Sequence, residues 1–166
     1  MSQKNYRVAI VPGSFDPITN GHISIVRRAA RDYDKVYLAV MINDSKNYLF
    51  DIDERAAIAE ACLGDISNLR VITSRGMLWE LARDLDAVAL VKGYRNDVDY
   101  TYEQKMAEYN SSHYPKAQTV LLKAKPELEA LSSTAVRERI LSGKALDGYL
   151  PQSGIKLIDE DLKKNK

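Results

Sequence analysis

The stretch that decides the fold runs Val8-Ala9-Ile10-Val11-Pro12-Gly13-Ser14-Phe15-Asp16-Pro17-Ile18-Thr19-Asn20-Gly21-His22. Its first four residues form a short apolar run, which is typical of a buried strand. The next residues are rich in turn formers, and a helix is expected to begin at or near His22. A helix N-terminus carries unpaired N–H groups and the positive end of the helix dipole, so this strand–loop–helix unit suits an anion such as phosphate.

The same stretch matches neither of two common phosphate-binding motifs. The dinucleotide fingerprint needs three close glycines, whereas Gly13 and Gly21 stand far apart with no glycine between them. A Walker A loop needs a Gly-Lys-Ser/Thr ending, which does not follow here. The plainer alternative is an ordinary strand–turn–helix without a function.

The composition is ordinary for a globular chain of 166 residues, with 45% apolar and 28% charged residues. This length predicts one domain over residues 1–166. The net charge of +1 argues against a nucleic-acid binder that works by bulk electrostatics. We expect no membrane span and no signal peptide. The single cysteine, Cys62, lies in an apolar stretch, which predicts a buried thiol and a cytoplasmic protein.

Short apolar runs alternate with helical patterns along the whole chain. We expect strands at Val8–Val11, Val36–Met41, Leu69–Ile72, Ala87–Val91 and Thr119–Leu122. We expect helices at Gly21–Tyr33, Asp53–Leu63, Met77–Leu85, Val98–His113, Ser132–Leu141 and Ile155–Leu162. This alternation predicts an α/β protein: a single Rossmann-like domain with a five-stranded parallel sheet, helices on both faces and a C-terminal helical segment.

The loops expected after the strands carry cations, hydroxyls and helix N-termini, at the end of the sheet where ligands bind. In chain order they offer Ser14 and His22, then Lys46, then Lys92-Gly93-Tyr94-Arg95, and finally Ser132-Ser133-Thr134. Together these groups suit a polyphosphate ligand. Each group also has a plainer interpretation. Lys46 is then a solvated side chain, Lys92 and Arg95 pair with Asp97 or Asp99, and the hydroxyls only cap a helix.

The expected site is rich in hydrogen-bond donors and poor in bases. The chain shows no Ser–His–Asp order and no metal-ligand spacing, and we interpret Asp16 as a turn former. Such a site fits a nucleophile that is already anionic, such as a phosphate that attacks a nucleotide phosphoryl group.

A second substrate is indicated by one face of the helix at 98–113. The spacing of Tyr102, Met106, Tyr109 and Asn110 puts them on that face, and Met77 and Leu78 are expected to face the same cleft. Core packing is the alternative for the apolar members. It explains Asn110 less well, because a buried amide needs hydrogen-bond partners.

Three motifs resemble those of the bacterial phosphopantetheine adenylyltransferases, which belong to the nucleotidyltransferase superfamily with a Gly-His signature. The motifs lie at Pro12–His22, Lys92–Glu103 and Leu131–Arg137, and the resemblance covers nearly the whole chain. It implies an enzyme that joins 4′-phosphopantetheine to ATP with Mg²⁺ and gives dephospho-coenzyme A and pyrophosphate. It also implies a homohexamer.

The resemblance further implies roles for single residues. His22 would stabilise the transition state at the α-phosphorus, and Lys46 would bridge both substrates. The ATP site would include Ser14, Phe15, His22, Gly93, Tyr94, Arg95, Glu103, Ser132, Ser133 and Thr134. Phosphopantetheine would contact Ser14, Lys46, Leu78, Lys92 and Asn110, and no metal ligand is assigned.

The chain departs from the family pattern at three places. Ser14 stands where Thr is common, which keeps the hydroxyl. Lys92 stands where Arg is common and lacks the bidentate fork. The acidic stretch Glu127-Leu128-Glu129 is unexpected beside a triphosphate. Two other functions stay open at this point: another small-molecule adenylyl- or cytidylyltransferase, for example one acting on nicotinamide mononucleotide, and a flavodoxin-like nucleotide-binding domain without chemistry.

Overall fold

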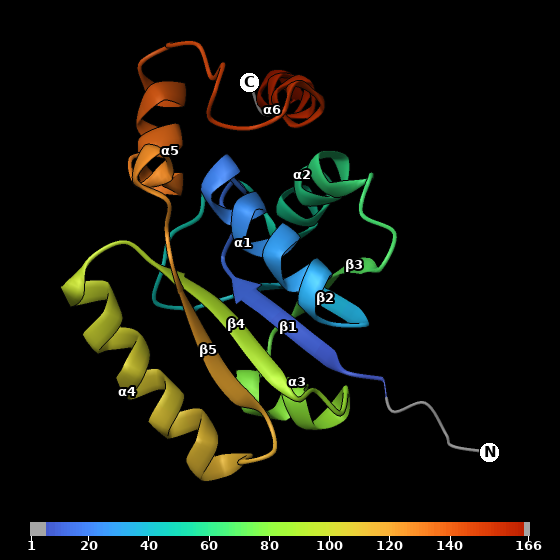
Figure 1. Cartoon of the computed structure of the whole chain (residues 1–166). Coiled ribbons are helices and arrows are strands. Elements are labelled where there is room, and N and C mark those ends of the chain that lie inside the picture. The colour runs from blue at the N-terminus through green and yellow to red at the C-terminus, as the bar shows by residue number, and fades with distance from the viewer. Residues whose placement is uncertain (1–5, 165–166) are drawn as a thin grey trace.

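The sheet reverses its strand order at β1, which lies between β2 and β4. In the computed structural model, which describes residues 6–164, five parallel strands follow the order β3-β2-β1-β4-β5 (Figure 1). They are β1 Val8–Gly13, β2 Lys35–Met41, β3 Leu69–Ser74, β4 Ala89–Tyr94 and β5 Gln118–Lys123. A crevice between strands whose connections leave in opposite directions is where such sheets bind ligands.

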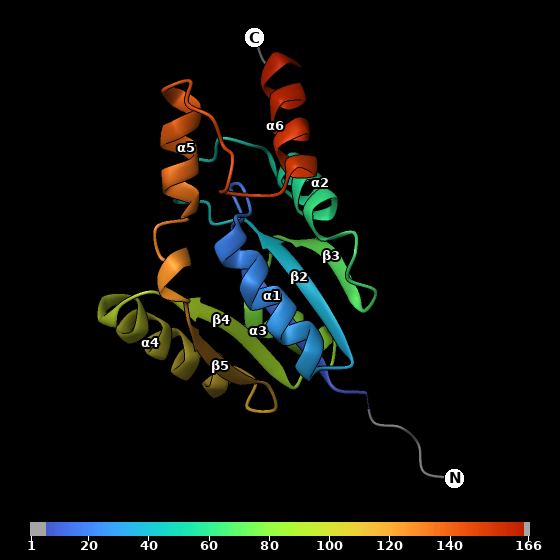
Figure 2. The same ribbon diagram turned by 45° about the horizontal axis from the view of Figure 1, so that its top comes forward.

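Helices cover both faces of the sheet, as predicted. They are α1 Asn20–Asp32, α2 Ile52–Leu63, α3 Leu78–Asp84, α4 Asp97–His113, the 3₁₀ helix η1 Pro126–Leu128, α5 Ser133–Leu141 and α6 Gln152–Lys164. α1 and α2 lie on one face, and α3 and α4 lie on the other (Figure 1). Figure 2 shows α5 and α6 standing away from the sheet, with α6 beside α2. The predicted α/β class is therefore confirmed.

Each central strand contributes to two cores. In β1, Ala9 and Val11 pack with Val26 of α1, whereas Ile10 between them packs with Ala82 of α3. Successive side chains of a strand point to opposite faces, so a strand that is covered on both sides must be apolar throughout. This is why the runs at Val8–Val11 and Ala87–Val91, which predict the central strands β1 and β4, show no polar alternation.

The predicted boundary of β4 is wrong by the largest margin among the strands. The apolar run predicts Ala87–Val91, but the strand runs over Ala89–Tyr94. Its pairing with β5 continues to Tyr94↔Lys123, so Lys92, Gly93 and Tyr94 end the strand instead of forming a loop. Parallel pairing supplies backbone hydrogen bonds beyond the point where the side chains stop being apolar.

The predicted start of the C-terminal helix is also wrong. α6 begins at Gln152, and the amides of Gly154 and Ile155 both donate to the Pro151 carbonyl, at 3.0 and 3.1 Å. The first turn of this helix is polar, so its hydrophobic pattern starts only at Ile155. The other predicted ends lie within two residues of the observed ones.

Gly154 sets how closely α6 approaches α2. A Cβ at this position would overlap Sγ of the buried Cys62 and lie 3.0 Å from Cδ1 of Leu150. Burial raises the pKa of the Cys62 thiol to about 11, so the group is neutral and packs as an apolar side chain. The expectation of a buried thiol is confirmed.

Gly154→Ala is therefore expected to lower the free energy of unfolding by about 1–3 kcal/mol through overpacking. Urea unfolding would measure the loss. In Gly154→Ala/Cys62→Ala the sulfur is removed and the new methyl group gains room, so we expect part of the loss to be recovered. Losses that simply add, with Cys62→Ala alone as the control, would contradict this packing.

Candidate active site

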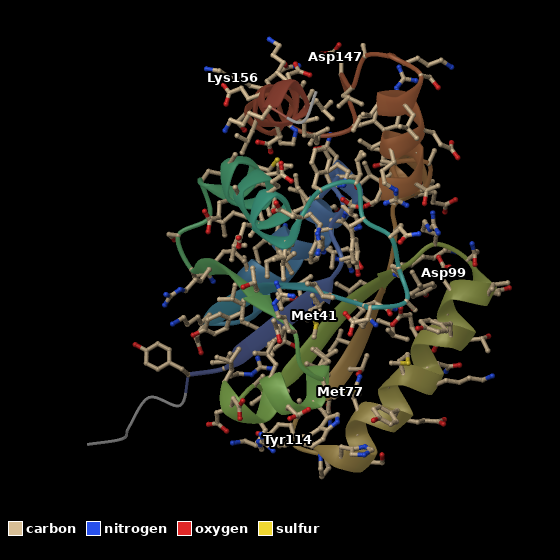
Figure 3. All side chains as sticks on the ribbon, turned by 180° about the vertical axis from the view of Figure 1, so that it is seen from behind. Met41, Met77, Asp99, Tyr114, Asp147 and Lys156 are labelled. Atoms are coloured by element: carbon tan, nitrogen blue, oxygen red, sulfur yellow. The ribbon has the colours of Figure 1, made fainter. Side chains whose placement is uncertain are left out.

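A cavity of about 430 Å³ opens where β1, β2 and β4 end. Figure 3 shows Asp99 at the end of α4 that is closest to this region and Tyr114 at the far end of that helix. The residues that the sequence assigned to a site and that line the cavity are Ser14, Phe15, His22, Lys46, Leu78, Lys92, Gly93, Tyr94, Arg95 and Glu103. These side chains come from segments far apart in the chain, so the fold assembles one site from several motifs.

Four predicted site residues lie outside this lining. Asn110 of α4 is buried, with 3% of its surface exposed. The other three open α5 and have partners within the protein. Ser132 Oγ accepts from the Ala135 amide at 3.0 Å, Ser133 Oγ donates to the Pro17 carbonyl at 2.8 Å, and Thr134 Oγ1 accepts from Arg137 at 3.1 Å. Contact of these residues with a ligand stays a prediction.

The expected stripe on α4 divides between cavity and surface. Tyr102 and Met106 line the cavity, but Tyr109 is 41% exposed outside it. Leu78 lines the cavity, whereas Met77 is 44% exposed. The prediction that Met77 and Tyr109 face the cleft is therefore wrong. Tyr109 lies nearly one turn beyond Met106 along α4, where its ring packs against that of His113 with the centroids 4.5 Å apart.

His22 completes the cap at the N-terminus of α1. The backbone N–H of Thr19, the N-cap residue, donates to His22 Nδ1 at 3.0 Å, as the third helical residue does in a capping box. The Thr19 hydroxyl donates to the Leu131 carbonyl at 2.7 Å. Since Nδ1 accepts, the proton of the neutral ring must sit on Nε2. The cap thus fixes a tautomer whose Nε2–H can donate to a ligand in the cavity.

The charge state of His22 agrees with this tautomer. Burial, and secondly the positive charge of Arg95, lower the pKa of His22 from 6.5 to about 4. The imidazole is therefore neutral at pH 7. It can donate a hydrogen bond through Nε2 but carries no positive charge.

We expect His22 to titrate near pH 4, which NMR of the imidazole C–H protons would measure. The chain has two histidines, so His113→Gln leaves one imidazole to assign. The unfolded ring binds its proton at about 6.5 and the folded ring only at about 4, so stability present above pH 6.5 is lost as the pH falls toward 4. A midpoint near 6.5 in the folded protein would contradict the assigned tautomer and burial.

Two ion pairs line the cavity. The Lys92 ammonium contacts the Glu103 carboxylate, with side chains 19% and 15% exposed. Arg95 Nε lies 3.1 Å from Asp99 Oδ2, which is one of the two pairings that the plainer interpretation allowed. Lys92 pairs with neither of the two aspartates that the plainer interpretation named, because β4 extends through Lys92 and faces this side chain toward the second turn of α4.

Lys46 is presented by a tight turn after β2. The Asn43 side-chain oxygen accepts from the Ser45 amide at 3.0 Å, and the Lys46 amide donates to the Asn43 carbonyl at 2.9 Å. Lys46 is exposed, and within residues 6–164 no ion-pair partner holds it. Its charge is available to an anion at the mouth of the cavity.

Asp16 is more than the turn former that the sequence suggested. It is 2% exposed, and its carboxylate accepts from the amides of Leu49 and Phe50 at 2.9 and 3.0 Å. This fastens the loop that carries Lys46 to the loop that carries Ser14. Sequence reasoning missed it because the two amides lie more than thirty residues away.

The acidic stretch after β5 turns its charges outward. Leu128 and Leu131 line the cavity, while Glu127 and Glu129 are exposed and lie outside the lining. Gly21 permits this close approach, because a Cβ there would lie 3.3 Å from the Leu131 carbonyl oxygen. The segment therefore closes the cavity with leucines, and its two carboxylates do not line it.

Within residues 6–164, no cluster of three or more His, Cys, Asp or Glu side chains is arranged to hold a metal ion. Every helix in that range is too short or too polar to span a bilayer.

Comparison with known proteins matches residues 10–139 to the cytidylyltransferase-like family. The phosphopantetheine adenylyltransferase of Lactobacillus helveticus is 40% identical over 93% of this chain and 95% of its own. That of Alkaliphilus oremlandii is 40% identical over 92% of this chain and 97% of its own. Among solved structures, a putative nicotinate-nucleotide adenylyltransferase from Vibrio parahaemolyticus has a TM-score of 0.67 at 17% identity, covering 94% of this chain and 93% of that one. The last likeness concerns the fold alone.

Proposed function

Because the chain belongs to the phosphopantetheine adenylyltransferase family, we propose that it transfers the adenylyl group of ATP to 4′-phosphopantetheine. The products are dephospho-coenzyme A and pyrophosphate. The observation that carries this function is the cavity in which Ser14, His22, Lys46 and Lys92 meet. Four donors on one cavity suit two phosphate-bearing substrates.

The reaction needs no general base, because the nucleophile is already an anion. An oxygen of the phosphopantetheine phosphate attacks the α-phosphorus of ATP and forms the new P–O bond. The bond from that phosphorus to the oxygen shared with the β-phosphate breaks, and its electron pair leaves with pyrophosphate. The protein contributes in-line placement of the two substrates and stabilisation of charge on the transferring group.

His22 is proposed to donate its Nε2–H to an oxygen of the α-phosphoryl group. The ring keeps its proton throughout, which agrees with a pKa held at about 4 by burial. A donor that is already oriented stabilises charge without reorganisation during the reaction. Lys46, which is exposed at the cavity mouth, is proposed to bridge the phosphates of both substrates.

The remaining contacts are proposed from the resemblance and from the cavity lining. ATP would meet Ser14, Phe15, Gly93, Tyr94, Arg95 and Glu103, with Ser132, Ser133 and Thr134 near its phosphates. Phosphopantetheine would meet Ser14, Lys92, Leu78 and Asn110. Ten of the predicted residues line the cavity, which supports the arrangement.

We include Mg²⁺ in the proposed reaction. The carboxylates that line the described cavity, Asp99 and Glu103, already face Arg95 and Lys92, so we expect the ATP phosphates to supply its main ligands. When bound there, Mg²⁺ neutralises phosphate charge.

The proposal also includes a homohexamer in the cytoplasm. The hexamer rests on the family resemblance, and sedimentation velocity of the purified protein would measure it. The compartment rests on the single buried thiol, Cys62, which has no second cysteine in the chain to pair with.

Pyrophosphate release tests the function directly. The purified protein receives ATP and Mg²⁺ with 4′-phosphopantetheine, with nicotinamide mononucleotide, or with no acceptor. We expect release only with phosphopantetheine, with dephospho-coenzyme A formed in equal amount. Release with nicotinamide mononucleotide would assign another acceptor, and binding of ATP without release to any acceptor would favour a nucleotide-binding domain.

A further inference from the structure

Among residues 6–164, Arg55 is the largest of the side chains that are almost completely buried, with 1% of its surface exposed. It lies in the first turns of α2, and its neighbours on the same helix face are Ile58, Ala59 and Cys62, which belong to the core. A guanidinium among such residues must satisfy its donors within the protein.

The guanidinium joins three segments at the cavity end of the sheet. Nη1 donates to the carbonyl of Ser14 at 2.7 Å and to that of Met41, the last residue of β2, at 3.0 Å. Nε donates to the carbonyl of Phe50 at 3.2 Å. The group also lies 3.9 Å from the ring centroid of Tyr48. One side chain thus ties the loop after β1 to both ends of the loop that carries Lys46.

The bond to Ser14 fixes the orientation of one peptide group. Ser14 and Phe15 line the cavity, whereas Arg55 lies outside it and borders a separate hollow with Phe50 and Asp51. In a planar trans peptide the C=O and the following N–H point in opposite directions. Because Arg55 holds the Ser14 carbonyl on its own side, the N–H of Phe15 points to the other side, where the cavity lies.

The local backbone would not hold this orientation without support. Phe15 has a φ of 49°, in the left-handed region that a residue with a Cβ rarely adopts. Such a conformation costs on the order of 1–3 kcal/mol and persists only where the surroundings impose it. The Phe15 ring is buried beneath Gly13, and the carbonyl on its N-terminal side is held by Arg55.

We propose that Arg55 is a positioning residue that aims the Phe15 N–H at a phosphate group in the cavity and seats the Lys46 loop beside it. This role rests on the proposed function, in which phosphates of the nucleotide lie against Ser14 and Phe15. Arg55 touches no substrate itself. It acts through the Ser14–Phe15 peptide and through the carbonyls of Met41 and Phe50.

The composition of the chain allows a direct test of the peptide orientation. The chain has two phenylalanines, so labelling with ¹⁵N-phenylalanine gives two amide signals. The Phe50 amide is bonded to the Asp16 carboxylate at 3.0 Å and serves as the internal reference. Inorganic pyrophosphate is expected to shift the Phe15 signal of the parent protein much more than the Phe50 signal. Arg55→Lys keeps the positive charge but lacks the planar guanidinium, two of whose nitrogens bond three carbonyls. In this variant the Phe15 shift is expected to vanish.

Kinetics supply the second readout. We expect Arg55→Lys to lower kcat about 100-fold, as the loss of one oriented amide donor does in other enzymes, with KM for phosphopantetheine within about threefold. Arg139→Met is the matched control, because Arg139 also donates to a backbone carbonyl, that of Ala145 at 2.7 Å, and lies over a tyrosine ring. Arg139, Ala145 and Tyr149 do not line the cavity, so its kcat and Phe15 shift should equal those of the parent.

The two readouts separate the possible results. Parental kcat and a parental Phe15 shift in Arg55→Lys would overturn the proposal, as would a lower kcat with the shift intact, since Arg55 would then be structural only. If the parent protein releases no pyrophosphate with phosphopantetheine, the proposed reaction fails. A Phe15 shift with pyrophosphate that disappears in Arg55→Lys would still support the positioning role in that case. Thermal unfolding of each variant confirms that the comparison is made on folded protein.

Discussion

Replacing His22 with Ala is expected to lower kcat by about 10³-fold, while the affinity for ATP changes by less than about threefold. The reason is that the Nε2–H meets an oxygen whose charge grows mainly in the transition state. An interaction of that kind affects kcat and leaves ground-state binding nearly unchanged. Pyrophosphate release gives kcat, and calorimetric titration with ATP in the absence of the acceptor gives the affinity.

Two further variants separate the donor from the helix cap. His22→Asn retains a short acceptor for the Thr19 amide but lacks a donor at the Nε2 position, so we expect a stable protein with a kcat close to that of His22→Ala. His22→Gln can reach the Nε2 position with its amide and should retain more activity. His113→Gln, at the exposed end of α4, serves as the control. A parental kcat in His22→Asn would contradict the role assigned to Nε2.

Lys92→Met is expected to raise KM for phosphopantetheine about 100-fold, with a smaller effect on kcat. Part of this loss is the missing charge-assisted hydrogen bond to the phosphate. The rest comes from Glu103, whose Oε2 is buried and, within the described residues, makes no regular hydrogen bond while it faces the Lys92 ammonium. Without Lys92, that carboxylate is unbalanced and repels an incoming phosphate.

The double variant Lys92→Met/Glu103→Gln tests this explanation. Removing the unbalanced charge should bring KM for phosphopantetheine back to within about tenfold of the parent value, although two residues have changed. The free energy of unfolding should recover in the same way, because a buried unpaired carboxylate also destabilises the fold. If the double variant instead has a KM for phosphopantetheine at or above that of Lys92→Met, Glu103 does not balance Lys92.

The sequence predicted those parts of the site in which a charged or polar side chain comes soon after an apolar strand run. His22, Lys46 and Lys92 follow apolar strand runs, and parallel strands bring their carboxyl ends to one edge of the sheet. The fold class follows from the same alternation. The roles of Asp16 and Arg55 were not predicted, because their hydrogen-bond partners are backbone groups of distant segments. Every residue has such groups, so the pattern of side chains does not show which of them are paired.

Arg55 did leave one signal in the sequence. It is the only charged side chain on the face of α2 formed with Ile58, Ala59 and Cys62, where a solvated residue is not expected. That signal predicts burial but cannot name the acceptors. The end of β4 was missed for a related reason, since its last residues pair through the backbone while their side chains are polar or absent.

The reversal of strand order at β1 has a consequence for how the chain is made. β1 is central in the finished sheet, but β4, its second neighbour, begins only at Ala89. During translation, β1–β3 can pair as soon as they leave the ribosome. β1 is then an edge strand whose backbone groups stay unpaired on one side until β4 has been synthesised. An apolar, unpaired strand edge invites association between nascent chains. Nascent chains arrested before Ala89 should therefore associate with one another. They should also fail to bind nucleotide, because they lack β4, which lines the cavity.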